Sequence, residues 1–264
     1  TDTGAVTIKQ IGADASTAGA GAVTIGHTGK TLASITFSGP VYTSSGAQTF
    51  IADGYSMTGT NPAFTTSADA ITFTDGDTGD LVLADVANLT ISTAGGVGAV
   101  DIQVAIKGTT GDGDDATDVT INAGSGAITI EGISQDINDV ALTSSSSITL
   151  KGNIETAGDS SDTGAGKAVR GDVTFTGPVL LTNNVLIDTN SSGNNGNVTF
   201  SGTTSTVNST VGGSEKTLTI LSGSGAVDFQ GVIGGVADKH LGGLSVNATG
   251  NDTGTIDVLA IGAT

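Results

Sequence analysis

The stretch Gly124–Gly132 reads GSGAITIEG, and Gly223–Gly231 reads GSGAVDFQG. Both begin with Gly-Ser-Gly-Ala, both end with Gly, and in each one polar residue separates two apolar residues. A strand with one buried face shows this alternation, because successive side chains point to opposite sides. We therefore expect short strands whose polar residues, Thr129 and Asp228, face outward. The apolar residues expected to face a core are Ile128, Ile130, Val227 and Phe229.

Looser copies of this phrase recur along the whole chain, and most of their intervals are similar. They begin at Gly4, Gly21, Asp69, Gly98, Gly126, Gly171, Gly196, Gly225 and Gly254. A second phrase, such as Leu89-Thr90-Ile91, follows the first at a nearly constant distance in four of the units, and a weaker apolar stretch lies between the two. Each unit therefore contains about three short strands separated by Gly, Asn, Asp and Ser, which are turn-forming residues.

Repeats of this length indicate a solenoid or a propeller. A propeller blade needs about four strands in roughly 40 residues, whereas three strands in about 28 residues suit one coil of a parallel β-solenoid. The sequence shows no useful helical periodicity. We therefore predict an all-β chain, residues 1–264, that forms a single continuous parallel β-solenoid with about three short strands per coil and roughly ten coils.

The sequence also repeats over an interval longer than one coil. The phrase at Gly98 recurs at Gly225, and other phrases recur at nearly the same interval, which predicts super-repeats over approximately 4–125 and 126–253 and a third copy starting at 254. The segments Asp2–Ala13 (DTGAVTIKQIGA) and Asp252–Ala263 (DTGTIDVLAIGA) match closely. We therefore expect the chain to be a slice of a longer tandem array or a subunit. Its partners would be adjoining repeats or copies of itself, placed end to end.

Composition excludes several classes of function. Asp and Glu number 26 against 8 Lys and Arg, which gives a net charge of −18 and disfavours nucleic acid as a partner. No apolar run is long enough to cross a bilayer, so direct membrane insertion is not expected. The chain has no Cys and therefore no disulfide, and its 3% of aromatic residues predict a core that is not rich in aromatics. The mean hydropathy of +0.17 argues against disorder.

Two acidic stretches are candidate calcium loops, because clustered carboxylates and carbonyls are the ligands that Ca²⁺ prefers. The first contains Asp75, Asp77 and Asp80, and the second contains Asp112, Asp114 and Asp118. Neither has the Glu that completes an EF-hand loop. The alternative is that both are solvated acidic turns, and the sequence leaves both interpretations open.

Catalytic chemistry is not predicted. His27 and His240 are the only imidazoles, and neither has a His, Cys or paired carboxylate at ligand spacing. The tripeptide Arg170-Gly171-Asp172 matches an integrin-binding motif, but its last two residues also belong to a strand phrase. The threonines show no fixed period that would place them on one flat face. We therefore expect no enzymatic activity, no catalytic residue and no cofactor other than calcium.

The strand phrases, SSGAQTF at Ser44–Phe50 and VGGSEKTLTILSGSGAVDFQGVIGG at Val211–Gly235 resemble filamentous-haemagglutinin-like repeats. Those repeats occur in very large bacterial surface proteins, and the resemblance covers nearly the whole chain. It implies a right-handed parallel β-helix, secretion to the bacterial cell surface and a role in adhesion or matrix structure. No secretion-domain motif of that family is visible here.

The expected function is therefore a non-enzymatic extracellular structural module, a rod-like segment of a bacterial surface fibre or adhesin. Its host or cell-surface receptor is unknown. The alternative is a self-assembling extracellular filament or surface-layer subunit, because an acidic, Cys-free, Thr-rich composition also suits that class, particularly together with calcium.

Overall fold

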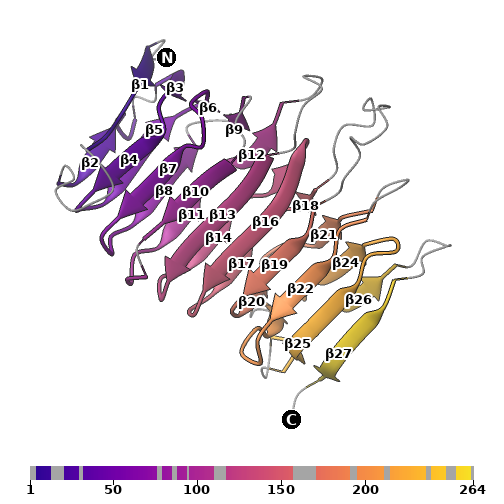
Figure 1. Ribbon diagram of the computed structural model, residues 1–264. Helices are drawn as coiled ribbons and strands as arrows, with labels where there is room; N and C mark the ends of the chain where they lie inside the picture. Colours follow the sequence, from indigo (N-terminus) through magenta and orange to yellow (C-terminus); the bar gives the residue numbers. More distant parts are fainter. Residues whose placement is uncertain are drawn as a thin grey trace.

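The computed structural model consists of parallel strands stacked side by side from one end of the chain to the other (Figure 1). It describes residues 4–12, 21–29, 32–75, 79–84, 88–93, 95–109, 117–156, 171–190, 195–210, 215–235, 239–247 and 254–262. These residues contain strands and turns but no helix. Accordingly, no helix in this part of the chain is long and apolar enough to cross a membrane.

The strands form three parallel ladders, which we name A, B and C. Ladder A is a ten-stranded sheet, whereas ladders B and C belong to one larger sheet. Ladder A contains β1 (Ala5–Ile8), β3 (Ser34–Phe37), β6 (Tyr55–Met57), β9 (Asp80–Leu83), β12 (Ala105–Gly108), β15 (Ile133–Ser134), β18 (Ile154–Glu155), β21 (Val185–Asp188), β24 (Thr217–Leu221) and β26 (Gly243–Val246).

Ladder B contains β2 (Val23–Ile25), β5 (Gln48–Ala52), β8 (Ile71–Asp75), β11 (Val100–Ile102), β14 (Ile128–Ile130), β17 (Ile148–Leu150), β20 (Val179–Leu181) and β23 (Val207–Ser209). Ladder C contains β4 (Val41–Ser44), β7 (Ala63–Thr66), β10 (Asn88–Ser92), β13 (Thr117–Gly124), β16 (Ile137–Ser144), β19 (Val173–Thr176), β22 (Val198–Ser201), β25 (Val227–Ile233) and β27 (Ile256–Ile261). The last residues of β25 and β27 extend into ladder B, where Val207, Ile233 and Ile261 follow one another in register.

The chain passes through the ladders in the order B, A, C and then B again, and we call one such passage a coil. Between β2 and β23, each strand pairs with the third strand after it, so the same ladder is reached once in every coil. The result is a nearly closed wall of parallel strands around one core. The all-β prediction is confirmed, and the pairing agrees with a parallel β-solenoid.

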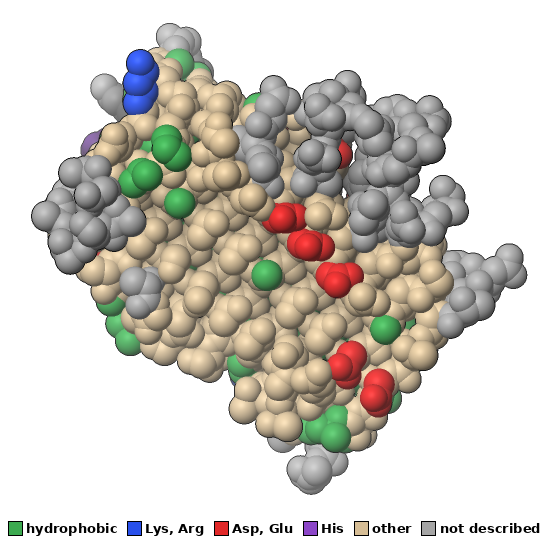
Figure 2. All heavy atoms as spheres, in the orientation of Figure 1, with side chains coloured by type: hydrophobic (Ala, Val, Ile, Leu, Met, Phe, Trp, Pro, Cys, Tyr) green, Lys and Arg blue, Asp and Glu red, His purple; other side chains and the backbone are tan. Residues whose placement is uncertain are grey.

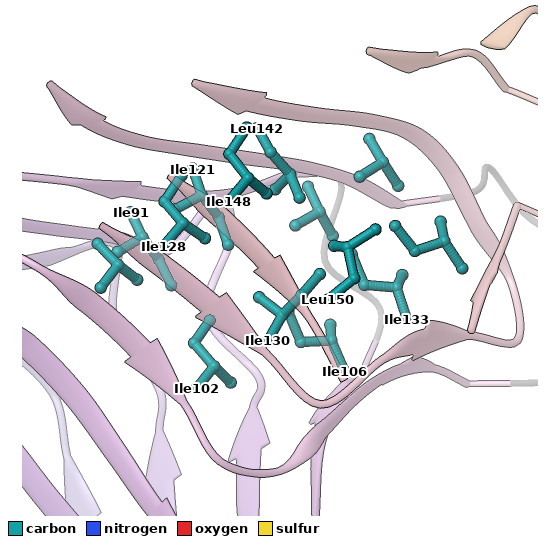
Figure 3. Packing of buried hydrophobic residues seen from close by; sticks show 14 of the residues in the cluster. Ile91, Ile102, Ile106, Ile121, Ile128, Ile130, Ile133, Leu142, Ile148 and Leu150 are labelled. Carbon is teal, nitrogen blue, oxygen red and sulfur yellow. The ribbon is translucent and has the colours of Figure 1, made fainter. Parts of the chain in front are cut away.

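The core consists of apolar columns that run along the stack, because a parallel register places equivalent residues of successive coils above one another at about 4.8 Å. Figure 3 shows part of this core, with Ile91, Ile121 and Leu142 following one another in one column. The column of ladder C contains Ile11, Tyr42, Phe64, Ile91, Ile121, Leu142, Phe175, Phe200, Phe229 and Val258.

Ladders A and B each contribute a similar column. In ladder A it contains Val6, Ile35, Tyr55, Leu81, Ile106, Ile133, Ile154, Ile187, Ile220 and Val246. In ladder B it contains Val23, Gln48, Ile71, Val100, Ile128, Ile148, Val179, Val207, Ile233 and Ile261. The one polar member, Gln48, is fully buried, and its Nε2 donates to the carbonyls of Tyr42 (2.9 Å) and Thr65 (3.0 Å).

The predicted facing of the two opening phrases is confirmed. Ile128 and Ile130 are fully buried, Val227 and Phe229 are 1% exposed, and the residues between these pairs, Thr129 and Asp228, are only partly buried. The phrases nevertheless lie on different ladders, because β14 belongs to ladder B and β25 to ladder C. The strands that match in the longer period, β8 with β22 and β11 with β25, are fourteen strands apart. Since fourteen is not a multiple of three, each phrase recurs one ladder away from its earlier copy.

Aromatic residues are few, as the composition indicates, but their rings are concentrated in two places. In the N-terminal part, Phe37 makes edge contacts with the rings of Tyr42, Phe50 and Phe64 at centroid distances of 4.9 to 5.0 Å. In the C-terminal part, Phe200 stacks between two phenylalanines, at 4.9 Å from Phe175 and 4.6 Å from Phe229. Few aromatics are needed for this, because the register places them in neighbouring coils.

Candidate functional surface

A row of Asn and Asp side chains runs along one edge of ladder C. Each member directly precedes a buried residue near the start of its strand, as Asp118 precedes Val119 and Asp172 precedes Val173. The inward residues Val119, Val140, Val173 and Val198 are in register, so the polar residues before them stack as well. We call this set the Asx row: Asn61, Asn88, Asp118, Asp139, Asp172 and Asn197.

Hydrogen bonds connect successive members of the Asx row. The Asp139 N–H donates to Asp118 Oδ1 (3.1 Å), the Asp172 N–H to Asp139 Oδ1 (2.7 Å), and the Asn197 N–H to Asp172 Oδ1 (2.7 Å). The Ala226 N–H then donates to Asn197 Oδ1 (2.8 Å). In the four members from Asp118 to Asn197, a side-chain oxygen therefore accepts a backbone N–H of the next coil, which ties neighbouring coils together near the start of the ladder C strands.

Asp139 carries the electrostatic cost of this arrangement. Burial raises the pKa of its carboxyl above the ordinary value of 3.8, and the negative charges of Asp118 and Asp172 raise it further, although the hydrogen bond from the Asp172 N–H opposes them. Figure 2 shows acidic side chains in an oblique line across the face that it draws. Because the pKa of Asp139 is raised in the folded chain, ionising its carboxyl group lowers the free energy of unfolding.

We expect Asp139→Asn to stabilise the protein at pH 7 and to have no such effect below about pH 3. A folded-state pKa above the unfolded one means that ionisation costs stability above the folded pKa, and that this cost disappears once both states are protonated. The amide keeps an Oδ1 acceptor for the Asp172 N–H, as Asn197 does for Ala226. Urea unfolding at both pH values measures the difference.

Asp101→Asn is the matched control, because it removes the same charge from β11. Its register neighbours are Thr72 and Thr129 rather than carboxylates. We expect a smaller change for this variant at pH 7. An equal gain for the two variants would show that net charge, and not the stacking of Asp139, sets the effect.

Hydroxyl side chains also form rows on the outside of the wall. In ladder B the outward residues Thr49 and Thr72 are in register, as are Thr129 and Thr149. In ladder C, Thr174 is in register with Thr199. The threonines have no fixed period in the sequence because turn lengths vary, yet several of them are in register within the ladders. The rows give this surface short, uncharged polar groups.

The residues of the predicted calcium loops do not come together in the described part of the chain. Asp80 lies in β9, and its Oδ2 accepts from Lys107 Nζ at 2.7 Å. Asp118 lies in β13 within the Asx row, and Asp75 ends β8. Asp77, Asp112 and Asp114 lie outside the described residues. Among the residues that the structure describes, no group of three or more His, Cys, Asp or Glu is placed to hold a metal ion.

A second ion pair, Lys151 Nζ with Glu131 Oε1 at 2.6 Å, also joins two coils. Both ion pairs are partly exposed, so each contributes about 1 kcal/mol or less to the free energy of unfolding.

In the integrin-like tripeptide Arg170-Gly171-Asp172, Arg170 lies outside the described residues, whereas the Asp172 carboxylate accepts two hydrogen bonds from Asn197. The Asp172 side chain therefore contributes to the link between coils.

Sequence reasoning missed the Asx row, although its signal was present. Asn or Asp stands immediately before a buried apolar residue at Asn88-Leu89, Asp118-Val119, Asp139-Val140, Asp172-Val173 and Asn197-Val198. These pairs were treated as turn residues of single strands, since the ladder that each strand joins was not known.

Comparison with protein-family models, with curated proteins and with solved structures finds no match.

Proposed function

We propose that this chain is a non-enzymatic extracellular structural module, a rod-like segment of a bacterial surface fibre or adhesin. In this proposal the solenoid is right-handed and has about ten coils. Its task is mechanical: the stacked coils act as a stiff spacer, and the turns that project from the wall carry any recognition of a host or cell-surface receptor.

The continuous inward columns are the observation that carries this proposal. Members of each column stack without a break from coil to coil, and inter-coil hydrogen bonds of the Asx row add to the strand pairing. The buried apolar side chains of all three ladders form one continuous core. A wall built in this way resists bending and keeps its polar side chains on the outside.

Surface location is tested with antibodies raised against the purified chain and applied to intact cells of the source bacterium. The proposal expects labelling of intact cells and loss of the label after brief protease treatment of the cell surface. Labelling only after lysis would contradict it. Small-angle scattering of the purified chain tests the rod separately, because a compact, nearly spherical particle would rule out the spacer role.

The alternative is a self-assembling extracellular filament or surface-layer subunit. One specific observation favours it: the outermost strands, β1 and β2 at one end and β26 and β27 at the other, are each paired on one side only among the described residues. In the calcium-dependent form of this alternative, millimolar Ca²⁺ raises the melting temperature by mass action and a chelator reverses the increase. An unchanged melting temperature would leave the acidic stretches as solvated turns.

A further inference from the structure

Among the residues that the structure describes, the strands at the two ends of the stack are each paired on one side only. β1 pairs with β3 and β2 with β5, while β26 pairs with β24 and β27 with β25. The first and last strands lie at opposite ends of the structure (Figure 1). Unpaired backbone N–H and C=O groups on an edge are a template for another parallel strand.

The C-terminal edge also leaves members of the apolar columns uncovered. Ile261 is 71% exposed, whereas Ile233, the preceding member of its column, is 2% exposed. Ile256 is 50% exposed, whereas Val227, with which it is in register, is 1% exposed. These side chains face the same interior as the rest of the core, so a further coil would bury them.

The two edges match in chemistry, ladder by ladder. The column of ladder A ends in Val246 at one edge and in Val6 at the other. In ladder C the corresponding ends are Val258 and Ile11, and in ladder B they are Ile261 and Val23. Stacking the N-terminal edge on the C-terminal edge would therefore continue all three columns with aliphatic side chains.

The edges also match in phase. The chain order is B, A, C, and the described C-terminal strand β27 finishes in ladder B at Ile261. The next ladder in that order is A, and the first described strand at the other edge, β1, lies in ladder A. A second copy placed on the C-terminal edge would therefore supply the ladder that follows, without a gap or an overlap in the winding.

We infer that the edge formed by β26 and β27 binds the β1 and β2 edge of a second copy of this chain, head to tail. In the joined register Val6 follows Val246, Ile11 follows Val258, and Val23 follows Ile261. In the same register Gln10 of one copy lies opposite Asp257 of the other, and Lys9 lies opposite Ile256, which the methylene groups of Lys9 would cover. Because the contact is heterologous and leaves both outer edges open, it propagates into a filament.

This inference rests on the proposed rod and specifies the contact by which the alternative, a self-assembling filament, would form. Its test uses variants in which one edge is blocked. Ile261→Glu blocks the C-terminal edge, and Val23→Glu blocks the N-terminal edge, because each places a carboxylate in the apolar joint. Leu259→Glu is the matched control. Leu259 is also strongly exposed, at 61%, but it is not in register with any residue of the inward columns.

Sedimentation velocity and electron microscopy over a concentration series give the readout. We expect the unmodified chain and Leu259→Glu to form rods whose length increases with concentration. Each blocked variant alone should remain monomeric, with association at least about a hundredfold weaker. An equimolar mixture of the two blocked variants should form dimers only, because each supplies the edge that the other lacks.

Three outcomes would overturn the inference: an unmodified chain that stays monomeric at all concentrations, a mixture that stays monomeric, or self-association of Val23→Glu alone, which would indicate an edge pairing with its own copy. Circular dichroism melting of each variant shows whether it remains folded. Small-angle scattering of a monomeric variant separates the two proposals, since a rod that does not stack refutes only the head-to-tail contact.

Discussion

Ile130→Asp is expected to lower the free energy of unfolding by roughly 4 kcal/mol or more, enough to unfold much of the chain. Ile130 is fully buried in β14 and is in register with Ile102 and Leu150. Figure 3 shows these side chains within one apolar cluster. The change loses about 1.5 to 3 kcal/mol of apolar burial and adds a carboxyl group without a partner.

Thr129→Asp is the comparison that isolates this effect, because it introduces the same side chain one residue earlier on the outside of the wall. Thr129 is in register with Asp101 and Thr149. Two like charges in register cost about 0.2 to 1 kcal/mol. Urea denaturation of both variants gives the two free energies, and equal losses would contradict the assignment of inward and outward faces.

The alternation of single strands was predictable because it is a local property. Two apolar residues around one polar residue specify which side chains of β14 and β25 are buried, whatever the strands pair with. The turn residues between strands and the absence of helical periodicity then led to the all-β class. Ile128 and Phe229 are buried as these patterns predict.

The ladder of each phrase was not predictable in the same way, because it depends on the number of strands that lie between two copies. The phrase that begins at Gly126 next recurs at Gly171, and the strand label advances from β14 to β19, which is five strands instead of three. The phrase therefore moves from ladder B to ladder C. Interval lengths alone do not separate a long turn from an extra strand.

The same reason explains why the Asx row and the aromatic contacts were missed. Phe37 and Phe64 are far apart in sequence, yet their ring centroids are 4.9 Å apart, because their strands belong to neighbouring coils. Asp139 and Asp172 are also far apart along the chain, and the Asp172 N–H donates to Asp139 Oδ1 at 2.7 Å. Such pairs become neighbours only through the register of strands in successive coils, and the amino-acid composition carries no information about that register.

Glycine in the phrase has a different origin from the one expected. Gly is a turn-forming residue between the strands, yet Gly126 and Gly225 are not among the glycines with positive φ. A Cβ on Gly126 would lie 2.0 Å from the carbonyl oxygen of Gly98, which occupies the same place one coil earlier. A Cβ on Gly225 would lie 2.1 Å from the oxygen of Gly196. The close approach of two backbones therefore requires glycine here.

Gly126→Ala should for this reason destabilise the protein by roughly 3 kcal/mol. The new methyl group meets backbone atoms of Gly98, which do not rotate away, so the two coils must separate locally. That movement strains the bond from the Val100 N–H to the Ala127 carbonyl, which is 2.9 Å long. The free energy of unfolding, measured by urea denaturation at a protein concentration where assembly is absent, gives the loss.

Gly21→Ala tests this cause at the same place in the same phrase, since Gly21 begins GAVTI as Gly126 begins GAITI. Gly21 precedes β2 at the open N-terminal edge, and a Cβ there would meet nothing within 4 Å. Its φ is not positive, so alanine should leave stability unchanged or raise it by about 0.4 to 1 kcal/mol through the unfolded chain. If Gly126→Ala were as harmless as Gly21→Ala, contact between neighbouring coils would not be what keeps glycine in the phrase. If both were equally harmful, the cause would lie in the conformation of the turn itself.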